Sequence, residues 1–202
     1  MRKILNHFKK NDPKIYLCLK DGVKIERLKP KNPDEYFSQL CRSIIFQQIS
    51  GKAGDAILGR FLLLFPKKKI TAKKVSSLKE EKIRQAGISP QKLKYLKSLA
   101  EHFNEKKIKV GDFDKLSDEE IISELVKVTG IGRWTSEMFL MFTLAREDIF
   151  SFGDLGLKKG LMRVYGFKKY PSQKRIEKII NRWSPYKTYG CLALWHSADK
   201  TD

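Results

Sequence analysis

Residues 125–160 read LVKVTGIGRWTSEMFLMFTLAREDIFSFGDLGLKKG, and this stretch decides the fold. An amphipathic helix is expected to end at Val128, the turn TGIG follows at 129–132, and a second apolar helix begins directly after it. Two glycines in so short a turn allow positive φ and remove the β-carbons that would keep a ligand from the backbone. The amides of the turn and of the next helix can then bind a phosphate oxygen near the positive end of a helix dipole. A bare G-x-G is equally compatible with an ordinary turn between two helices.

Apolar residues recur at helical spacing along most of the chain, which predicts a nearly all-helical protein. Ser89 is a candidate N-cap with Pro90 at the first helical position, and Ser117 with Glu120 has the pattern of a capping box. Further helices are expected over residues 133–145, 155–165, 173–183 and 187–197. Residues 16–30 are the least regular, and we expect a turn at Asp21-Gly22 with short extended pieces there.

The composition predicts a folded protein that binds a polyanion. The 202 residues include 42 lysines and arginines against 23 aspartates and glutamates, a formal net charge of +19. Hydrophobic residues make up 41% of the chain, too many for a disordered basic tail. Because the charge is spread over predicted helices, a long polyanion suits it better than a small acidic ligand. The basic stretch 67–82 is compatible with a solvated loop and helix face, and also with a dedicated DNA contact.

Several other classes of protein are excluded. No apolar run approaches the roughly 18 residues of a membrane span, and no apolar segment typical of a signal peptide opens the chain. A soluble intracellular protein is therefore expected. Cys18, Cys41 and Cys191 have no C-x-x-C spacing, which excludes a four-cysteine iron–sulfur cluster and a disulfide framework. The three histidines are scattered, so no catalytic metal is expected.

Two motifs together carry a resemblance to a known family. The hairpin VTGIG at 128–132 and the loop FSFGD at 150–154 resemble the helix-hairpin-helix DNA glycosylase superfamily. Its signature is a V/L-P/T-G-I/V-G hairpin followed by a Gly/Pro-rich loop that ends in an aspartate. The R-W-T at 133–135 is similar to the 3-methyladenine DNA glycosylase II branch. The resemblance continues in four further blocks, which are residues 6–14, 41–53, 87–96 and 183–195.

The chain departs from the family pattern at two positions and in its extent. Thr129 stands where proline is common, and Gly190 stands where the family has alanine. There is no room for the N-terminal β-domain that some members carry. The resemblance therefore implies a compact monomer of two closely packed helical subdomains with a cleft between them. One would comprise approximately residues 1–35 and 155–202, and the other approximately residues 36–154 with the hairpin at 125–145.

The resemblance assigns catalysis to Asp154, the aspartate that ends the loop. A carboxylate beside the sugar can stabilise the positive charge that develops as the base departs, and can orient or deprotonate water. By position alone, Asp154 is interpreted as the N-cap of the following helix, and it can serve in both roles. Bifunctional members carry lysine where this chain has Trp134, so the resemblance implies a monofunctional enzyme.

Aromatic residues are the candidates for the base pocket. Trp134 and Trp195 match aromatic pocket positions of the family branch. Alkylated bases are electron-poor and positively charged, so aromatic rings favour them by stacking and by cation–π attraction of about 1 kcal/mol. Tyr16, Phe46 and Phe152 are weaker candidates. Each of these five aromatics is also compatible with ordinary core packing.

The DNA-contact candidates lie at the hairpin and at two other positions. Gln48 is the candidate wedge that fills the gap left by an extruded base, or else a residue that caps its helix. Lys92 would add a phosphate contact, or is a solvated lysine. The resemblance also implies a structural Na⁺ or K⁺ held by the carbonyls of Val126, Val128 and Ile131. Phosphate contacts are expected from Thr129, Gly130, Ile131, Gly132, Arg133 and Thr135.

Three functions follow as hypotheses. The first is a monofunctional glycosylase that flips alkylated bases, such as 3-methyladenine and 7-methylguanine, out of double-stranded DNA and hydrolyses the N-glycosidic bond. The second is a glycosylase/lyase for oxidised bases. The third is a non-catalytic helix-hairpin-helix DNA-binding protein. The expected location is the cytoplasm or nucleoid, or the nucleus in a eukaryote.

Overall fold

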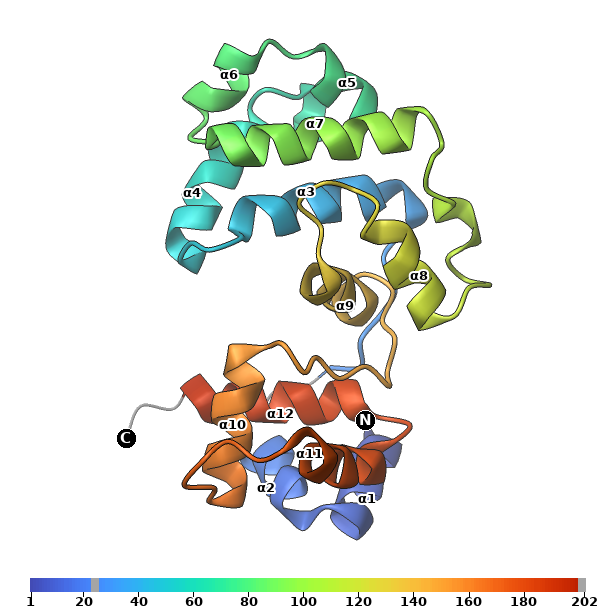
Figure 1. Cartoon of the computed structure of the whole chain (residues 1–202), viewed down its shortest axis with the longest axis vertical. Helices are drawn as coiled ribbons and strands as arrows, with labels where there is room; N and C mark the ends of the chain where they lie inside the picture. The colour runs from blue at the N-terminus through green and yellow to red at the C-terminus, as the bar shows by residue number, and fades with distance from the viewer. Residues whose placement is uncertain (23–25, 200–202) are drawn as a thin grey trace. The chain divides into compact units, whose positions relative to one another are not determined.

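The computed structural model describes residues 1–22 and 26–199, and within them it contains helices and no strand. The predicted all-helical class is confirmed. The chain divides into two compact units, of which unit 1 comprises residues 1–30 and 140–202 and unit 2 comprises residues 31–139. Figure 1 labels their helices. None of the helices in the described residues is both long and apolar enough to cross a membrane.

Unit 2 is built around two helices that lie side by side, α3 and α7 (Figure 1). Leu40 and Ile44 of α3 and Leu96 and Leu99 of α7 have no exposed surface, so these faces form the core of the unit. The bounds of its helices are α3 Tyr36–Phe46, α4 Gly51–Leu62, α5 Ala72–Ser77, α6 Glu80–Gln85, α7 Pro90–Asn104, α8 Asp118–Leu125 and α9 Arg133–Phe142, the last of which ends in unit 1. Short 3₁₀ turns lie at Pro33–Glu35, Pro66–Lys68 and Val110–Asp112.

Local capping signals set several helix starts in unit 2, as predicted. Ser89 accepts a hydrogen bond from the amide of Lys92, and Pro90 is the first residue of α7. Ser117 and Glu120 form a complete capping box at the start of α8. These caps satisfy amides that have no partner within the helix, which fixes the residue at which each helix begins.

Unit 1 packs α12 against both α10 and α2. Gly160 of α10 lies where α10 meets α12, since a β-carbon there would be 2.3 Å from the carbonyl oxygen of Leu194. Only glycine therefore allows this close approach. The helices are α1 Arg2–Asn11, α2 Pro13–Gly22, α10 Leu155–Tyr165, α11 Gln173–Ile180 and α12 Lys187–Asp199, with a 3₁₀ turn at Asn181–Trp183 after α11.

A buried carboxylate ties the ends of unit 1 together. Asp12, only 2% exposed, accepts hydrogen bonds from the indole nitrogen of Trp183 at 2.9 Å and from the hydroxyl of Tyr165 at 2.5 Å. Arg182 lies within 3.5 Å of the same carboxylate. Burial, with the hydrogen bond to Asp12 as a second cause, raises the pKa of Tyr165, so its hydroxyl remains a donor. Segments more than 150 residues apart in sequence are thereby joined through one side chain.

The structure corrects three details of the sequence prediction. Residues 16–22 belong to helix α2, whereas an irregular segment was expected; residues 23–25 lie outside the described part. The second helix of the hairpin ends at Phe142 and not at 145. Ala145 has a φ of +56°, a left-handed conformation that a helix interior does not contain. The remaining predicted helix over 173–183 is α11 followed by a 3₁₀ turn.

Both boundaries between the units lie earlier than predicted. The first lies after residue 30 and not after 35, and the second lies after residue 139 and not after 154. The physical reason for the second shift is a set of hydrogen bonds between residues 146–149 and the start of α12. The Thr188 hydroxyl donates to the carbonyl of Arg146 at 2.7 Å, and the Thr188 amide donates to Glu147 at 2.9 Å. The loop that leads to Asp154 is therefore part of unit 1.

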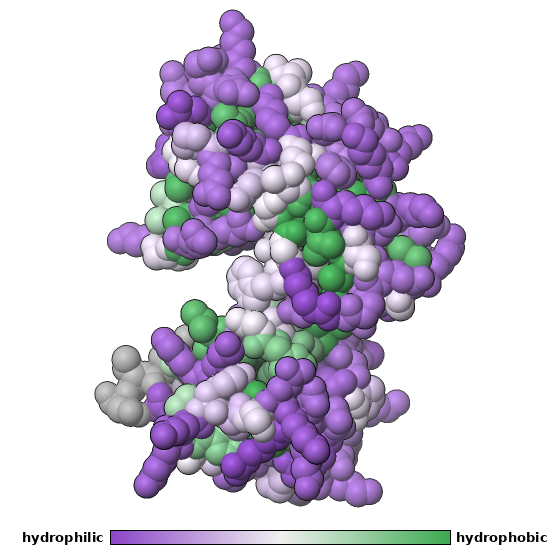
Figure 2. Space-filling model, viewed as in Figure 1, coloured by the Kyte–Doolittle hydropathy of each residue, from purple (hydrophilic) through white to green (hydrophobic). Residues whose placement is uncertain are grey.

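Hydrophilic side chains cover most of the drawn face of each unit (Figure 2).

Two of the three cysteines, Cys41 and Cys191, are fully buried, and Cys18 is partly buried. Burial raises the pKa of the Cys41 thiol, so this cysteine stays protonated.

Candidate functional site

The predicted site residues fall into two groups, one in each unit. Asp154 and Trp195 lie together in unit 1, where Tyr16 also lies on α2. Gln48, Lys92 and the hairpin residues 129–135 lie in unit 2.

Asp154 is the N-cap of α10. Its Oδ1 accepts a hydrogen bond from the amide of Leu157 at 2.7 Å, and its backbone is extended, with φ −77° and ψ 123°. The residue is 7% exposed. A carboxylate at a helix N-terminus faces the positive end of the helix dipole, which stabilises its negative charge. The capping role that the sequence indicated is therefore confirmed, and the cap also fixes the carboxylate in one orientation.

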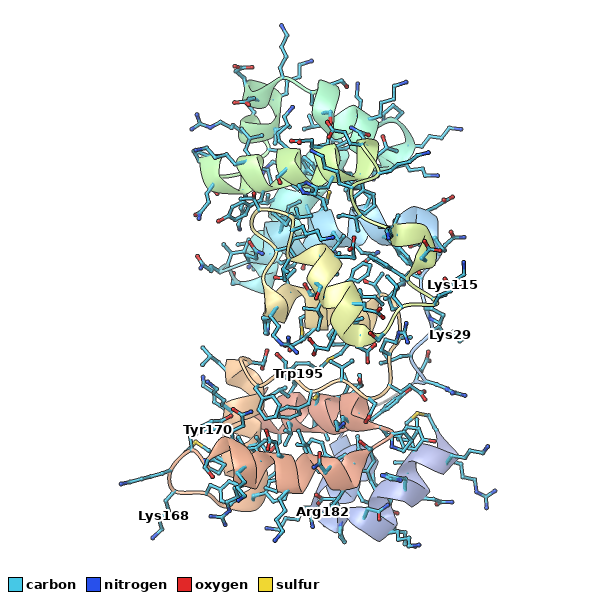
Figure 3. All side chains as sticks on the ribbon, turned by 45° about the vertical axis from the view of Figure 1, so that its right-hand side comes forward. Lys29, Lys115, Lys168, Tyr170, Arg182 and Trp195 are labelled. Carbon is cyan, nitrogen blue, oxygen red and sulfur yellow. The ribbon has the colours of Figure 1, made fainter. Side chains whose placement is uncertain are left out.

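Trp195 of α12 donates from its indole nitrogen to the same Oδ1 of Asp154, at 2.9 Å. Trp195 is labelled in Figure 3, on the last helix of unit 1. It is partly buried, and its ring centroid lies 5.8 Å from that of Phe142. An indole nitrogen can only donate, so this contact requires an acceptor oxygen from the carboxylate. Trp195 therefore holds the aspartate, a contact that its predicted place in an aromatic pocket did not include.

Gly156 provides the space for this contact, a role that was not predicted from the sequence. A β-carbon at position 156 would lie 2.7 Å from Cδ1 and 3.0 Å from Nε1 of Trp195, and 3.1 Å from Oδ1 of Asp154. The first of these distances is shorter than real β-carbons show, so any larger residue would displace the indole. The available signal was a glycine two residues after the aspartate, in the first turn of a predicted helix.

The two weaker aromatic candidates of unit 1 are Tyr16 and Phe152. Tyr16 is partly buried on α2. Phe152 packs edge-to-face on Phe150, with ring centroids 5.0 Å apart, and Phe150 in turn packs on Trp183 at 6.1 Å. Phe152 thus stabilises the loop before Asp154.

The hairpin turn is closed by its own backbone and by α7. The amide of Ile131 donates to the carbonyl of Val128 at 3.0 Å, and both side chains are buried. The amide of Thr129 donates to the hydroxyl of Ser98 at 3.3 Å. Ile131 therefore anchors the turn in the core, while Thr129 fastens it to α7.

The two glycines of the hairpin have different reasons to be glycine. Gly130 has a φ of +90°, and a β-carbon there would lie 2.1 Å from the ring of Tyr95. Gly132 has open space where a β-carbon would be, and it is exposed. Only Gly130 uses the positive φ that both glycines were expected to allow. Gly132 instead leaves the backbone open before the first turn of α9, as a phosphate-binding turn requires.

Gln47 links the turn after α3 to the hairpin, a role that was not predicted from the sequence. Its side-chain amide donates to the carbonyl of Gly130 at 2.9 Å and lies 3.4 Å from the hydroxyl of Thr135. Thr135 is 4% exposed, so its hydroxyl serves this contact inside the protein and does not face outward. No local pattern marks Gln47, because its partners lie more than 80 residues away in sequence.

Gln48, the predicted wedge, is exposed at the tip of the same turn. Its φ is +55°, a left-handed conformation that is uncommon for a residue other than glycine. Such strain persists where the surroundings hold it, and the contacts of Gln47 hold this turn. Ser50, and not Gln48, caps the next helix by accepting from the amide of Ala53. The C-cap of the preceding helix, α3, is Gln47, so the alternative that Gln48 caps that helix is wrong.

Several of the predicted site residues line a hollow of about 540 Å³ in unit 2. We call it the hairpin hollow; it is lined by Gln47, Gln48, Ile49, Ser89, Gln91, Lys92, Tyr95, Gly130, Trp134 and Thr135. Trp134 is 45% exposed there, which is not the burial of a core tryptophan. Lys92 donates to the carbonyl of Ile45 at 2.7 Å, and burial lowers its pKa. Lys92 is therefore not a freely solvated lysine, since it caps the C-terminal end of α3.

Arg133 is held by two carboxylates. It makes a bidentate pair with Glu119 of α8, and its Nε donates to Glu137 at 3.0 Å. The side chain of Arg133 keeps the pKa of Glu119 below its ordinary value, chiefly through these hydrogen bonds. The guanidinium that was expected to bind a phosphate is thus paired with protein carboxylates. Arg133 instead fastens the start of α9 to α8.

Phe46 packs where α3 meets α4. The guanidinium of Arg42 lies 4.4 Å from its ring centroid, and a β-carbon on Gly54 would lie 2.6 Å from its ring. These contacts favour the packing interpretation of Phe46 over a place in the base pocket.

The backbone of the hairpin offers oxygen donors suited to a hard cation. The carbonyl of Val128 already accepts the amide of Ile131, and a carbonyl oxygen has a second lone pair for another partner. Val126 ends α8 as its C-cap, and Ile131 lies in the turn. The donor chemistry of these three carbonyls therefore fits a monovalent cation.

A protein-family model and individual known proteins both relate this chain to DNA repair proteins. A model of the HhH-GPD superfamily base excision DNA repair protein matches residues 41–185. The DNA-3-methyladenine glycosylase 1 of Schizosaccharomyces pombe is 32% identical over 174 residues, which are 83% of this chain and 75% of that protein.

Two solved structures share the fold. A 3-methyladenine DNA glycosylase of Schizosaccharomyces pombe in complex with abasic DNA superposes with a TM-score of 0.80 at 28% identity, over 96% of this chain and 95% of that one. A DNA-3-methyladenine glycosidase of Bacillus halodurans gives a TM-score of 0.82 at 30% identity, over 98% and 89%. With the family match over residues 41–185, these findings show that the chain belongs to the HhH-GPD superfamily of base excision DNA repair proteins.

Proposed function

We propose that this protein is a monofunctional DNA glycosylase that excises alkylated bases, of the 3-methyladenine and 7-methylguanine type, from double-stranded DNA. The observation that carries the proposal is the aspartate of unit 1. Asp154 is almost buried at the N-terminus of α10, and its Oδ1 is held by the indole of Trp195 at 2.9 Å and by the amide of Leu157 at 2.7 Å. A single fixed carboxylate beside an aromatic ring suits a cationic reaction centre.

The proposed reaction is hydrolysis of the bond between C1′ and the base. As this bond breaks, its electron pair leaves with the base, and positive charge develops on the sugar. Asp154 stabilises that charge and accepts the proton of the water that attacks C1′. An alkylated base already carries a positive charge and leaves as a neutral molecule, so it needs no general acid. Trp195 fixes the carboxylate in the geometry that this step requires.

The hairpin and its hollow supply the proposed DNA-binding surface of unit 2. The exposed backbone at Gly132 and the first amides of α9 would bind a phosphate, with the cation at the carbonyls of Val126, Val128 and Ile131 adding positive charge. Gln48 would enter the duplex from its strained turn after the nucleotide is extruded. Trp134 would offer an exposed ring for stacking. The protein would act as a monomer in the compartment that holds the DNA.

The position of Trp134 supports the monofunctional reading over a glycosylase/lyase. A lyase needs an amine nucleophile to form a Schiff base with C1′. Trp134 stands where bifunctional relatives carry lysine, and an indole cannot form that adduct.

Release of free bases from methylated duplex DNA tests the proposal. We expect 3-methyladenine and 7-methylguanine in the supernatant with the wild-type protein, and a loss of release of about 100-fold or more in Asp154→Asn. The asparagine amide has the same size and can still accept the hydrogen bond from Trp195. A loss of activity would therefore be due to the loss of the negative charge. Undiminished release by Asp154→Asn would refute the catalytic assignment. A covalent adduct trapped by borohydride would instead indicate the lyase, and DNA binding without any release would indicate a non-catalytic protein.

A further inference from the structure

A basic surface begins at the candidate catalytic helix and has no role in the proposed reaction. Residues 155–175 contain seven lysines and arginines and no aspartate or glutamate. They cover α10, the loop after it and the start of α11. We define the α10 strip as six of its exposed or partly exposed residues, which are Leu155, Lys158, Lys159, Lys168, Lys169 and Tyr170. Tyr170 and Lys168 are labelled in Figure 3, on the loop between α10 and α11.

An aromatic contact joins the two parts of the strip. The ammonium of Lys158, on α10, lies 5.3 Å from the ring centroid of Tyr170, on the loop. Tyr170 is nevertheless 40% exposed, and burial of the remainder raises the pKa of its hydroxyl, so the ring stays neutral. The tyrosine thus holds the lysine in place while part of its surface stays open to a ligand.

The loop that carries Tyr170 is held by its own packing. Gly166 ends α10 in a left-handed conformation, and the amide of Phe167 donates back to Met162 at 2.9 Å. The ring of Phe167 stacks on Tyr165 with centroids 5.8 Å apart, and the guanidinium of Arg175 lies 4.5 Å from its centroid. A loop fixed from both helices loses little conformational entropy when it binds a ligand.

The strip is continuous with Asp154. Leu155 directly follows the aspartate and is 71% exposed, and the amide of Lys158 donates to the carbonyl of Asp154 at 3.1 Å. Four residues of α-helix span about 6 Å, so the backbone of Lys158 lies about one helical turn from Asp154, within the reach of a long lysine side chain. A strand whose sugar lies at Asp154 would therefore bring its next phosphate toward Lys158 and Lys159.

We propose that the α10 strip is a second DNA-contact surface, which binds the backbone of the lesion-containing strand beside the extruded nucleotide. Lys158 and Lys159 contact the phosphate next to the lesion, and Lys168 and Lys169 contact the phosphates beyond it. Tyr170 positions Lys158 and packs on the sugar–phosphate backbone. The strip lacks the carboxylates that would repel phosphates, and contacts of this kind position DNA without reading its sequence. This inference rests on the proposed function, because it takes the lesion strand to pass Asp154.

Salt-dependent binding measures the contact directly. The probe is a duplex with a stable abasic-site analogue that extends about one helical turn, or about 10 base pairs, to each side. We expect the Lys158→Ala, Lys159→Ala double variant to lower the slope of log K against log salt by about 1 to 2, because each lost phosphate contact removes about 0.9. Tyr170→Leu should give a smaller loss of affinity in the same direction. Unchanged thermal unfolding would establish that the variants fold.

A control variant separates direct contact from a general loss of charge. Lys9→Ala with Lys10→Ala removes the same charge from α1 of the same unit, where both lysines are exposed, and should keep the wild-type slope. Shortening the duplex on one side of the analogue should weaken binding by the wild type more than binding by the strip variant. Equal slopes in the strip and control variants, or equal sensitivity to shortening, would overturn the inference. Failure of the wild type to release any base would overturn the proposed function and leave the strip's binding result standing.

Discussion

Replacement of Gly156 by alanine tests whether the geometry of Asp154 and Trp195 matters for the reaction. The new methyl group would lie 2.7 Å from Cδ1 and 3.0 Å from Nε1 of Trp195. A normal contact between carbon atoms is about 3.5–4.0 Å, so the indole must move by about 1 Å. That movement is enough to break its 2.9 Å hydrogen bond to Asp154.

The effect on stability should be small, and the effect on catalysis large. Loss of a hydrogen bond to a charged group destabilises by about 1.5–3 kcal/mol, and alanine in place of glycine in a helix returns up to about 1 kcal/mol. The net loss of unfolding free energy is then about 1–2 kcal/mol. A misplacement of about 1 Å at a reacting group can slow a reaction about 100-fold. We therefore expect a 10- to 100-fold slower release of alkylated base.

Single-turnover release from methylated duplex DNA, with enzyme in excess, measures this effect on the chemical step. Gly153→Ala is the matched control, because it lies on the other side of Asp154 and has open space for a β-carbon. It should release base at the wild-type rate. Wild-type release by Gly156→Ala would refute the reasoning, as would an equal loss in both variants, since only position 156 crowds the indole.

Three further predictions concern the hairpin and the framework. Gly130→Ala should weaken duplex binding at least tenfold in a titration with undamaged DNA. The φ of +90° at this position, and a β-carbon only 2.1 Å from the Tyr95 ring, force the turn to move. In the control Gly132→Ala, the new β-carbon meets no atom within 4 Å, so this variant should fold normally. Gln47→Ala should free the Gln48 turn from Gly130, which hydrogen exchange would detect as faster exchange in residues 47–51, and unchanged exchange would contradict the proposed link. Asp12→Ala should lower the unfolding free energy by about 3–5 kcal/mol, because it leaves the buried donors of Trp183 and Tyr165 without an acceptor. At about 2–4 °C per kcal/mol, the melting temperature should fall by about 6–20 °C, and a fall of under about 3 °C would show that these donors find other partners.

Local features of the fold could be predicted because their causes are local. The N-cap of α7 at Ser89 and the capping box at Ser117 and Glu120 each act within three residues, so the sequence contains all their partners. The same holds for the start of α10 after Asp154. The helix over residues 16–22 was missed, because the Asp21-Gly22 pair indicated a turn where the structure has the last residues of α2.

The candidate site could be predicted only in part. The sequence identified Asp154, Trp195 and the hairpin through motifs, but it assigned Arg133 to phosphate binding. The structure pairs this arginine with Glu119, 14 residues earlier on another helix. No spacing rule predicts such a pair, because it depends on how α8 and α9 pack.

The sequence by itself determined the helical class, the family resemblance and the positive charge, since periodicity, motif order and composition are properties of the chain. The tertiary structure alone decided which atoms hold the functional groups. It placed Trp195 on Asp154 from 41 residues away, made Gly156 the space between them, and joined Gln47 to Gly130 across 83 residues. Contacts between distant segments form only when helices pack, and packing follows from the shapes of whole side chains. For that reason the sequence could name the aspartate, while the structure was needed to show what orients it.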